Sequence, residues 1–362
     1  MTNNDIYRSI LCICITMLTV VFIIPLIQKI ANHIGAIDIP NERKVHTKPI
    51  PRLGGLGIFF GFLVGYMVFG KNSLQMNSIL IGSFIVILTG IIDDIKPLSA
   101  KAKLFGQLLA SLVIVFYGNI LLTNITVFGL DINFAYFSYP ITIIFIIACM
   151  NIINLIDGLD GLSGGISAIF YASVIVICYF LNRTSGLEFS LALIMLGSTL
   201  GFLVHNFYPA TIFAGDTGSL FMGFIISIIS LLGFKTTVIT SVFIPLMILA
   251  VPVLDTLFAI IRRLLKHKHI YDADKEHFHH QLLKMNFSHR TTVLIIYVIN
   301  SLFATASILY TLNDKQDVFI GRIIYGILMI LVIWFVFKTN IITDRLRLKF
   351  SSKKINKKGS QK

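Results

Sequence analysis

Charged residues are scarce in this chain. They make up 13% of its 362 residues, and hydrophobic residues make up 56%, with a mean hydropathy of +0.86. Soluble domains have ~25% charged residues. A soluble protein of this length could bury a large core, but it would still need a polar surface that this composition cannot form. The sequence therefore excludes a soluble enzyme and predicts an all-α, polytopic integral membrane protein.

Cysteine is scarce as well, and none of it is spaced for chemistry. The four cysteines all lie within apolar segments: Cys12, Cys14, Cys149 and Cys178. The Cys-Ile-Cys sequence has neither the C-x-x-C spacing of a redox or metal motif nor a spacing that suits a disulfide. We expect the cysteines to be small buried side chains.

Long apolar runs are what the chain has instead. A helix that crosses a bilayer needs ~20 mostly apolar residues. The eleven predicted spans are approximately 7–31, 53–70, 77–95, 103–123, 139–156, 162–181, 188–206, 217–234, 237–261, 291–311 and 319–338. The first is too long for the apolar core of a signal peptide and has no small-residue cleavage site, so we expect a membrane helix. The second and seventh spans are the weakest, because one is short and glycine-rich and the other contains polar residues.

Basic residues are distributed unevenly between the loops. The net charge is +13, but the lysines and arginines lie between apolar runs and form no basic face, which argues against a nucleic-acid partner. Of these 30 residues, 24 fall on one side of the eleven spans and 6 on the other. The richer side is expected to be cytoplasmic, which places the N-terminus outside and the C-terminus inside. We expect residues 1–340 to form one membrane domain, and residues 341–362 a basic tail that is disordered or lies on anionic lipid.

Four polar clusters interrupt the apolar sequence, all on the predicted cytoplasmic side. They are residues 92–103, 151–165, 213–220 and 272–280. The first three hold five acids, which are Asp93, Asp94, Asp157, Asp160 and Asp216. Because a carboxylate close to a bilayer is costly, each of them is a candidate functional group.

The second cluster presents oxygen ligands on one helical face. Asn151, Asn154 and Asp157 are spaced three residues apart and share a face of a helix, which we expect to break at the glycines after Asp157 and Asp160. Amide and carboxylate oxygens suit Mg²⁺ or Mn²⁺ better than Zn²⁺. In the alternative interpretation, the asparagines bond neighbouring helices and the aspartates cap the next helix.

The first and third clusters place acids at helix ends. Asp216 opens a predicted helix after Gly215, where a carboxylate is favoured and free N–H groups also favour phosphate. Asp93 and Asp94 end a helix, where the dipole disfavours them, so they need a metal or a following lysine. The alternatives are an ordinary N-cap for Asp216 and a salt-bridged helix end for the pair.

The fourth cluster is rich in imidazole and the first loop is basic. His277, His279 and His280 lie in the longest predicted cytoplasmic loop, without the cysteines or spacing of a closed zinc site. We expect them to contact a sugar nucleotide, with a plain solvated loop as the alternative. The first loop ends with Pro-Arg-Leu-Gly-Gly; membrane sidedness explains most of its charge, and its glycines allow close backbone approach.

Five motifs together resemble the polyprenyl-phosphate N-acetylhexosamine-1-phosphate transferases. In chain order they are DIPNERKVHTKPIPRLGG, IDDIKPLSAKAKLFGQ, NIINLIDGLDGLSGG, AGDTGSLFMGF and ADKEHFHHQLL. The resemblance covers about residues 10–310. PNERKVH and ADKEHFHH are similar to the branch that uses UDP-N-acetylglucosamine (UDP-GlcNAc) to begin teichoic acid, O-antigen or related polymers. They are less similar to the branch that transfers phospho-N-acetylmuramoyl-pentapeptide.

The resemblance implies a role for each motif residue. Asp216 matches the Mg²⁺-binding aspartate, with Asn154 near the ion. The residues that match catalytic acids are the pair Asp93 and Asp94, which engage the lipid phosphate or the metal, and Asp157 and Asp160 on the active-site floor. Substrate-binding roles are expected for Asn151, Lys103, Gln107, Arg52, Gly215, His277, His279 and His280.

The resemblance also implies the reaction. N-acetylglucosamine 1-phosphate would pass from UDP-GlcNAc to undecaprenyl phosphate with release of UMP, using Mg²⁺ or Mn²⁺, at the cytoplasmic face of a bacterial plasma membrane. Membrane lipids are expected around the protein, and a homodimer is left open. A transporter is the main rival, but it would place polar residues on both faces and near mid-membrane. Another membrane transferase, acting on nucleotide-activated lipids, would need a different aspartate spacing.

Overall fold

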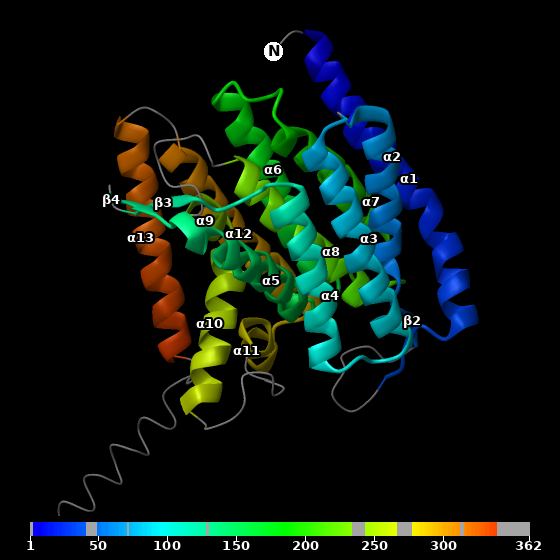
Figure 1. Ribbon diagram of the computed structural model, residues 1–362. Helices are drawn as coiled ribbons and strands as arrows, with labels where there is room; N and C mark the ends of the chain where they lie inside the picture. Colours follow the sequence, from blue (N-terminus) through cyan, green and yellow to red (C-terminus); the bar gives the residue numbers. More distant parts are fainter. Residues whose placement is uncertain are drawn as a thin grey trace, which may run out of the picture.

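The fold is almost entirely helical, as predicted for a membrane protein. The computed structural model describes residues 3–40, 49–70, 72–127, 130–233, 243–265, 277–311 and 315–338. Within these ranges the chain forms thirteen α-helices and two short β-hairpins (Figure 1). The long apolar runs therefore become helices, in which every backbone group can be satisfied within the segment.

The helices are numbered in chain order. They are α1 (Asn3–Ile34), α2 (Gly54–Phe69), α3 (Leu74–Ile95), α4 (Ala100–Leu112), α5 (Ser138–Ile156), α6 (Leu162–Phe180), α7 (Leu187–Asn206), α8 (Gly215–Gly233), α9 (Phe243–Ile248), α10 (Ala250–Leu265), α11 (Phe278–Lys284), α12 (His289–Thr311) and α13 (Lys315–Lys338). The strands β1 (Ile37–Asp38) and β2 (Ile50–Pro51) pair antiparallel, as do β3 (Asn124–Val127) and β4 (Leu130–Asn133).

Eight helical segments in the described part are long and apolar enough to cross a membrane. They are Asp5–Ile34, Leu74–Ile95, Ala100–Tyr117, Ala135–Ile156, Leu162–Phe180, Leu187–Asn206, Gly215–Gly233 and His289–Thr311. Two further apolar helices, Gly54–Phe69 and Phe319–Trp334, are shorter, and the predicted span 237–261 begins outside the described residues. The count of eleven crossings and the orientation therefore stay predictions.

One predicted span ends earlier than expected. The fourth continues from α4 through a π-helical turn, Val113–Tyr117, and stops there rather than at residue 123. Gly118 follows, and Asn119 then has a φ of 47°. A residue in this left-handed region cannot continue a right-handed helix, so the chain turns away toward the β3–β4 hairpin.

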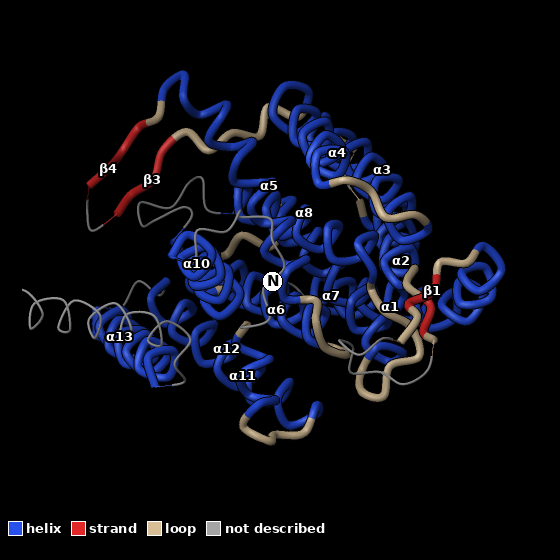
Figure 2. The backbone as a smooth tube through the Cα atoms, turned by 90° about the horizontal axis from the view of Figure 1, so that it is seen from below, coloured by secondary structure: helices blue, strands red, loops and turns tan. Residues whose placement is uncertain are grey.

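Helix α8 forms the centre of the bundle. Nearly all its residues are buried, and α2, α3, α5, α6 and α7 pack around it (Figure 2). Small residues allow the backbones to come close: a Cβ on Gly55 would lie 2.0 Å from the Gly218 nitrogen, and one on Gly90 2.4 Å from the Thr217 Cα. Such contacts are typical of helix packing in membranes. They fix the start of α8 between α2 and α3.

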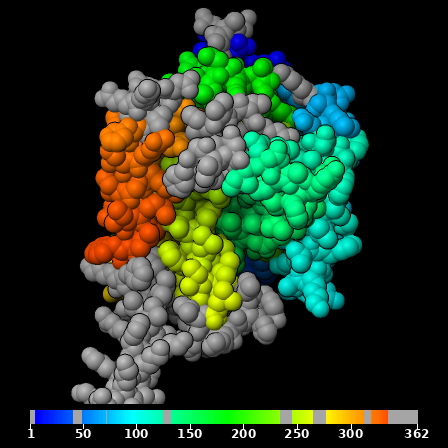
Figure 3. Space-filling view, turned by 60° about the vertical axis from the view of Figure 1, so that its left-hand side comes forward, coloured from blue at the N-terminus to red at the C-terminus, as the bar shows by residue number. Residues whose placement is uncertain are grey.

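The polar ends of the helices meet at one end of the bundle. Hydrogen bonds join the end of α3 to the start of α8, α5 to α8, and the α5–α6 loop to the end of α7. This end lies at the bottom of Figure 1, and the chain begins at the opposite end. On the face in Figure 3, α10 (yellow) lies beside α13 (orange to red). The bundle thus gathers the described residues of the predicted polar clusters at a single end.

Candidate active site

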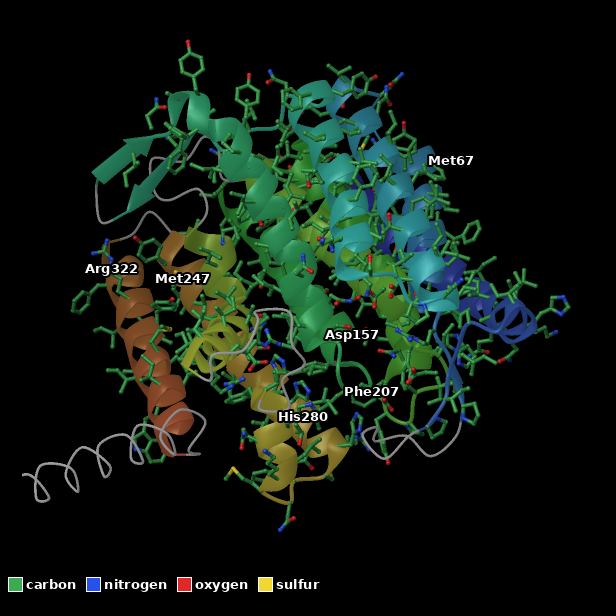
Figure 4. The ribbon with its side chains drawn as sticks, turned by 60° about the horizontal axis from the view of Figure 1, so that its bottom comes forward. Met67, Asp157, Phe207, Met247, His280 and Arg322 are labelled. Atoms are coloured by element: carbon green, nitrogen blue, oxygen red, sulfur yellow. The ribbon has the colours of Figure 1, made fainter. Side chains whose placement is uncertain are left out.

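A cavity of about 300 Å³ opens where the polar clusters meet. Its lining comes from the β1–β2 hairpin region, the ends of α5 and α7, the α5–α6 and α7–α8 loops and the starts of α8, α11 and α12. The lining residues are Asp38, Arg52, Asn154, Asp157, Gly158, Leu159, Asp160, Asn206, Phe213, Gly215, Asp216, His280 and His289. Figure 4 shows Asp157, Phe207 and His280 at this end of the molecule. Seven of the fourteen predicted site residues are therefore in the lining.

Asp94 does not line the cavity but caps helix α8, whose first two residues do. Its carboxylate accepts hydrogen bonds from the N–H groups of Asp216 (2.9 Å) and Thr217 (3.0 Å) and from the Thr217 hydroxyl (2.7 Å). The C-terminal end of α3 disfavours this charge, but the N-terminal end of α8 favours it. The contact with the start of α8 therefore compensates for the unfavourable position of Asp94 at the end of α3.

Gly215 is required for this junction. Its φ is +68°, and a Cβ there would lie 2.0 Å from the Arg52 carbonyl oxygen and 2.3 Å from an Asp94 carboxylate oxygen. Glycine adopts this conformation without a steric penalty. The sharp entry into α8 brings Asp216 to the cavity while its N–H group bonds Asp94.

Asp93 and Asp216 share one cation. The Lys103 Nζ lies 2.9 Å from Asp93 and also donates to Asp216, and Asp93 accepts a 2.7 Å bond from the Leu98 N–H. Oxygens of Asp93, Asp94 and Asp216 all lie within 4.8 Å of one another. The pair predicted to need a cation thus has one, and a cluster of three carboxylates remains that could hold a metal ion.

Arg52 is the second cation of the site. Its guanidinium lies 3.4 Å from Asp94, 3.8 Å from Asp216 and 3.6 Å from Asp38. Pairing of Ile37 with Pro51 and of Asp38 with Ile50 in the β1–β2 hairpin brings Asp38 close to Arg52. Asp38 and Arg52, which lie on either side of the first loop, therefore line the cavity together.

The two asparagines of α5 have different surroundings. The Asn151 amide donates to Gln107 (2.8 Å), and neither side chain lines the cavity. The Asn154 amide donates to Ser219 (2.8 Å), and its carbonyl oxygen accepts no hydrogen bond from the described residues. Asn151 and Gln107 thus join α5 to α4, as in the alternative interpretation of the sequence, whereas Asn154 offers an oxygen ligand to the cavity.

The two acids of the α5–α6 loop face the cavity. Asp157 accepts a 2.5 Å bond from the Ser163 hydroxyl, and Asp160 accepts a 3.0 Å bond from the Ala210 N–H. Burial raises the pKa of Asp157 to about 7, and the charge of Asp216 adds to this effect. A cation bound in the cavity would stabilise the ionised form of this carboxyl group.

The three predicted histidines have separate roles in the structure. His280 lines the cavity, and the His277 Nδ1 lies 3.0 Å from the Asp255 carboxylate. His279 is buried, and neither of its nitrogens has a partner among the described residues. Burial lowers the pKa of His279 to about 3, so this imidazole is neutral at physiological pH.

Five residues of the site were not among the predicted site residues. Asp38 begins the first motif and Phe213 begins the third polar cluster, whereas Asn206, His289 and, bonded to His277, Asp255 lie outside all of the motifs. His289 accepts a 2.9 Å bond from the Asp160 N–H. Asp255 could have been found, since it is an acid within a predicted span. The basic residues Arg43, Lys44, His46 and Lys48 lie outside the described residues.

Comparison with known proteins gives consistent relatives. Residues 76–234 match the glycosyl transferase family 4 profile. The chain is 40% identical over 311 residues to a probable undecaprenyl-phosphate N-acetylglucosaminyl 1-phosphate transferase of Bacillus subtilis (strain 168), covering 85% of this chain and 86% of the relative. It is 30% identical over 335 residues to a decaprenyl-phosphate N-acetylglucosaminephosphotransferase of Mycobacterium tuberculosis (strain ATCC 25618 / H37Rv), covering 82% of each. An undecaprenyl-phosphate alpha-N-acetylglucosaminyl 1-phosphate transferase of Escherichia coli (strain K12) is 28% identical over 290 residues, or 78% of each chain.

Proposed function

Because the chain belongs to glycosyl transferase family 4, we propose that it transfers N-acetylglucosamine 1-phosphate from UDP-GlcNAc to undecaprenyl phosphate. The products are UMP and undecaprenyl-pyrophosphate-GlcNAc, the first membrane intermediate of a cell-envelope glycopolymer such as teichoic acid or O-antigen. The observation that carries the proposal is the cavity at the helix ends, where Asp157, Asp160 and Asp216 meet Arg52. It joins acids, an amide and a guanidinium beside an apolar bundle, which suits a polar donor and a lipid acceptor.

The donor set of the cavity fits Mg²⁺, with Mn²⁺ as the alternative. Asp216 and Asn154 would hold the ion, since the carboxylate and the unbonded amide oxygen are hard ligands. Acids also outnumber cations: six carboxylates line or adjoin the cavity floor, against Arg52 and Lys103 among the described residues. A pyrophosphate would be repelled by this charge, so bound metal would supply charge neutralisation to donor and leaving group.

The reaction is a displacement at phosphorus. An oxygen of the lipid phosphate attacks the β-phosphorus of UDP-GlcNAc, and the bond from that phosphorus to the bridging oxygen breaks, so its electron pair leaves with UMP. The second pKa of a phosphate monoester is near ~6, so the acceptor is largely ionised at neutral pH and a general base is optional. The chain then contributes mainly positioning and charge stabilisation.

Each cluster has a part in this displacement. Arg52 donates to the pyrophosphate oxygens, and Gly215 lines the same cavity. Asp157 and Asp160 form the floor, and His280 contacts the sugar nucleotide from α11. Asp94 bonds the start of α8 and Lys103 donates to Asp216, while Asp93 pairs with Lys103. None of the three lines the cavity, so they act through Asp216.

A two-step route is the alternative mechanism. In it an aspartate attacks the β-phosphorus first and forms a covalent phospho-sugar intermediate. Of the four acids predicted to be catalytic, Asp157 and Asp160 line the cavity and could take this step, whereas both oxygens of Asp94 accept bonds from α8. Trapping of a labelled phospho-sugar on the enzyme would contradict the direct displacement.

We place the active site on the cytoplasmic face of the plasma membrane. The uneven distribution of lysine and arginine supports this orientation, and UDP-GlcNAc would be available there. Residues 1–340 are proposed as one catalytic membrane domain with residues 341–362 as its basic tail. A homodimer stays a prediction.

Release of UMP tests the proposed function. The purified protein in detergent would be incubated with UDP-GlcNAc, undecaprenyl phosphate and Mg²⁺. We expect UMP that depends on the lipid and disappears with EDTA. Release of UMP only from another UDP-N-acetylhexosamine would mean that the enzyme uses that donor instead of UDP-GlcNAc. If no such donor gives UMP while an active relative does under the same conditions, the proposed function is contradicted and a transporter is favoured.

A further inference from the structure

Helix α10 carries a buried acid that belongs to none of the motifs. Asp255 is 7% exposed and lies among the apolar residues of α10. A carboxylate at such a position is costly unless it is paired and hydrogen-bonded. Its partners therefore indicate what it does.

Both oxygens of Asp255 bind the start of α11. Oδ1 accepts a 2.8 Å bond from the Phe278 N–H, and Oδ2 lies 3.0 Å from the His277 Nδ1. These partners are 23 and 22 residues further along the chain. One carboxylate thus holds a backbone group and an adjacent side chain, which fixes both the position and the direction in which α11 begins.

Helix α11 in turn brings two imidazoles to the catalytic end. His280 lines the cavity, as do Asp157 and Gly158, and Figure 4 shows Asp157 and His280 at the same end of the molecule. His279 packs against the α5–α6 loop so closely that a Cβ on Gly158 would lie 2.6 Å from its Nε2. A shift of α11 would therefore move His280 in the cavity and loosen the loop that carries Asp157.

We propose that Asp255 is a positioning residue for the sugar-nucleotide donor. Through His277 and the Phe278 N–H it holds α11 so that His280 faces the cavity and His279 closes on the Gly158 turn. Asp255 and His277 do not line the cavity and act without touching the donor. The proposal rests on the proposed function, because it assigns α11 to the donor rather than to the lipid acceptor.

Steady-state kinetics of UMP release test this role with both substrates varied. Asp255→Ala removes both contacts, and we expect KM for UDP-GlcNAc to rise about tenfold while KM for undecaprenyl phosphate changes by less than about twofold. Adding His277→Ala to this variant should have little further effect, because the two residues act as one unit. Glu188→Gln on α7 is the control, a half-buried acid outside the site, and should leave both KM values unchanged.

Two conservative variants separate positioning from direct contact. In His277→Asn the amide nitrogen takes the place of Nδ1 and can still bond Asp255, whereas in His277→Gln it takes the place of Nε2. We expect the Asn variant to keep nearly the wild-type KM for UDP-GlcNAc and the Gln variant to resemble Asp255→Ala. Loss in the Asn variant with retention in the Gln variant would overturn the inference, since His277 would then act through Nε2 and not through its contact with Asp255.

The same assay distinguishes the inference from the function on which it rests. UMP release by the wild-type protein decides the function, and the ratio of the two KM changes decides the role of Asp255. An Asp255→Ala variant with unchanged KM for UDP-GlcNAc would overturn the inference. So would an equal rise in both KM values together with a lower melting temperature in detergent, because that result would make Asp255 a general structural residue.

Discussion

Asp94→Asn distinguishes a helix cap from a catalytic acid. Asp94 is 5% exposed as a residue, and its carboxylate accepts three hydrogen bonds, all from Asp216 and Thr217. An asparagine keeps one acceptor oxygen, but its NH₂ group would face a donor at the start of α8. A hydrogen bond to a charged group contributes ~1.5–3 kcal/mol, and the favourable charge at the helix N-terminus is lost as well.

We therefore expect Asp94→Asn to be less stable and partly active. If the loss of this hydrogen bond displaces Asp216 and raises the activation barrier by the same free energy, kcat falls by about ten- to a hundredfold. Asp216→Asn keeps the cap and removes the proposed metal ligand, so it should fold normally and retain less than about a tenth of the activity.

The assay pairs UMP release with thermal unfolding in detergent. The cap predicts a lower melting temperature for Asp94→Asn and a nearly unchanged one for Asp216→Asn. A stable Asp94→Asn protein that is as inactive as Asp216→Asn would refute the reasoning, because Asp94 would then take part in the reaction itself.

Further predictions concern the turn, the buried histidine and the metal. Gly215→Ala should lower both activity and melting temperature, because its Cβ would meet the Arg52 carbonyl oxygen, whereas Gly326→Ala, with nothing within 4 Å, should be harmless; equal effects would contradict the close packing. The pKa of His279 is lowered to about 3, against an ordinary ~6.5, so between these values the unfolded chain binds a proton that the folded chain does not. The free energy of unfolding should thus be highest above pH ~6.5 and fall as the pH decreases. Between pH 7.5 and pH 5 the melting temperature of His279→Asn should fall less than that of the wild-type protein. An equal fall in both proteins would contradict this role of His279. His279→Ala should raise KM for UDP-GlcNAc. A change only in KM for undecaprenyl phosphate would contradict the assignment of α11 to the donor. EDTA should abolish UMP release and Mg²⁺ restore it, and activity that persists in EDTA would exclude the metal role.

The sequence by itself determined the class of the protein and the location of its chemistry along the chain. Run length and hydropathy are local properties, so they predict helices and a membrane without any knowledge of packing. The end of α3 at Asp93 and Asp94, the break after Asp157 and the start of α8 at Asp216 follow from local signals and agree with the structure. The end of the fourth span was wrong, because the left-handed Asn119 overrides an apolar run.

Only the tertiary structure decided which of these residues line the cavity and which hold the helices in place. Asp94 and Thr217 are 123 residues apart, Lys103 and Asp216 113, and Asn151 and Gln107 44. No local pattern selects such partners, because they are brought together by close helix packing around α8 and by the glycines that permit it. A carboxylate at a membrane surface is costly in either arrangement. Whether it faces the cavity, like Asp157, or holds another helix, like Asp94 and Asp255, depends on which donors the fold places within hydrogen-bonding distance.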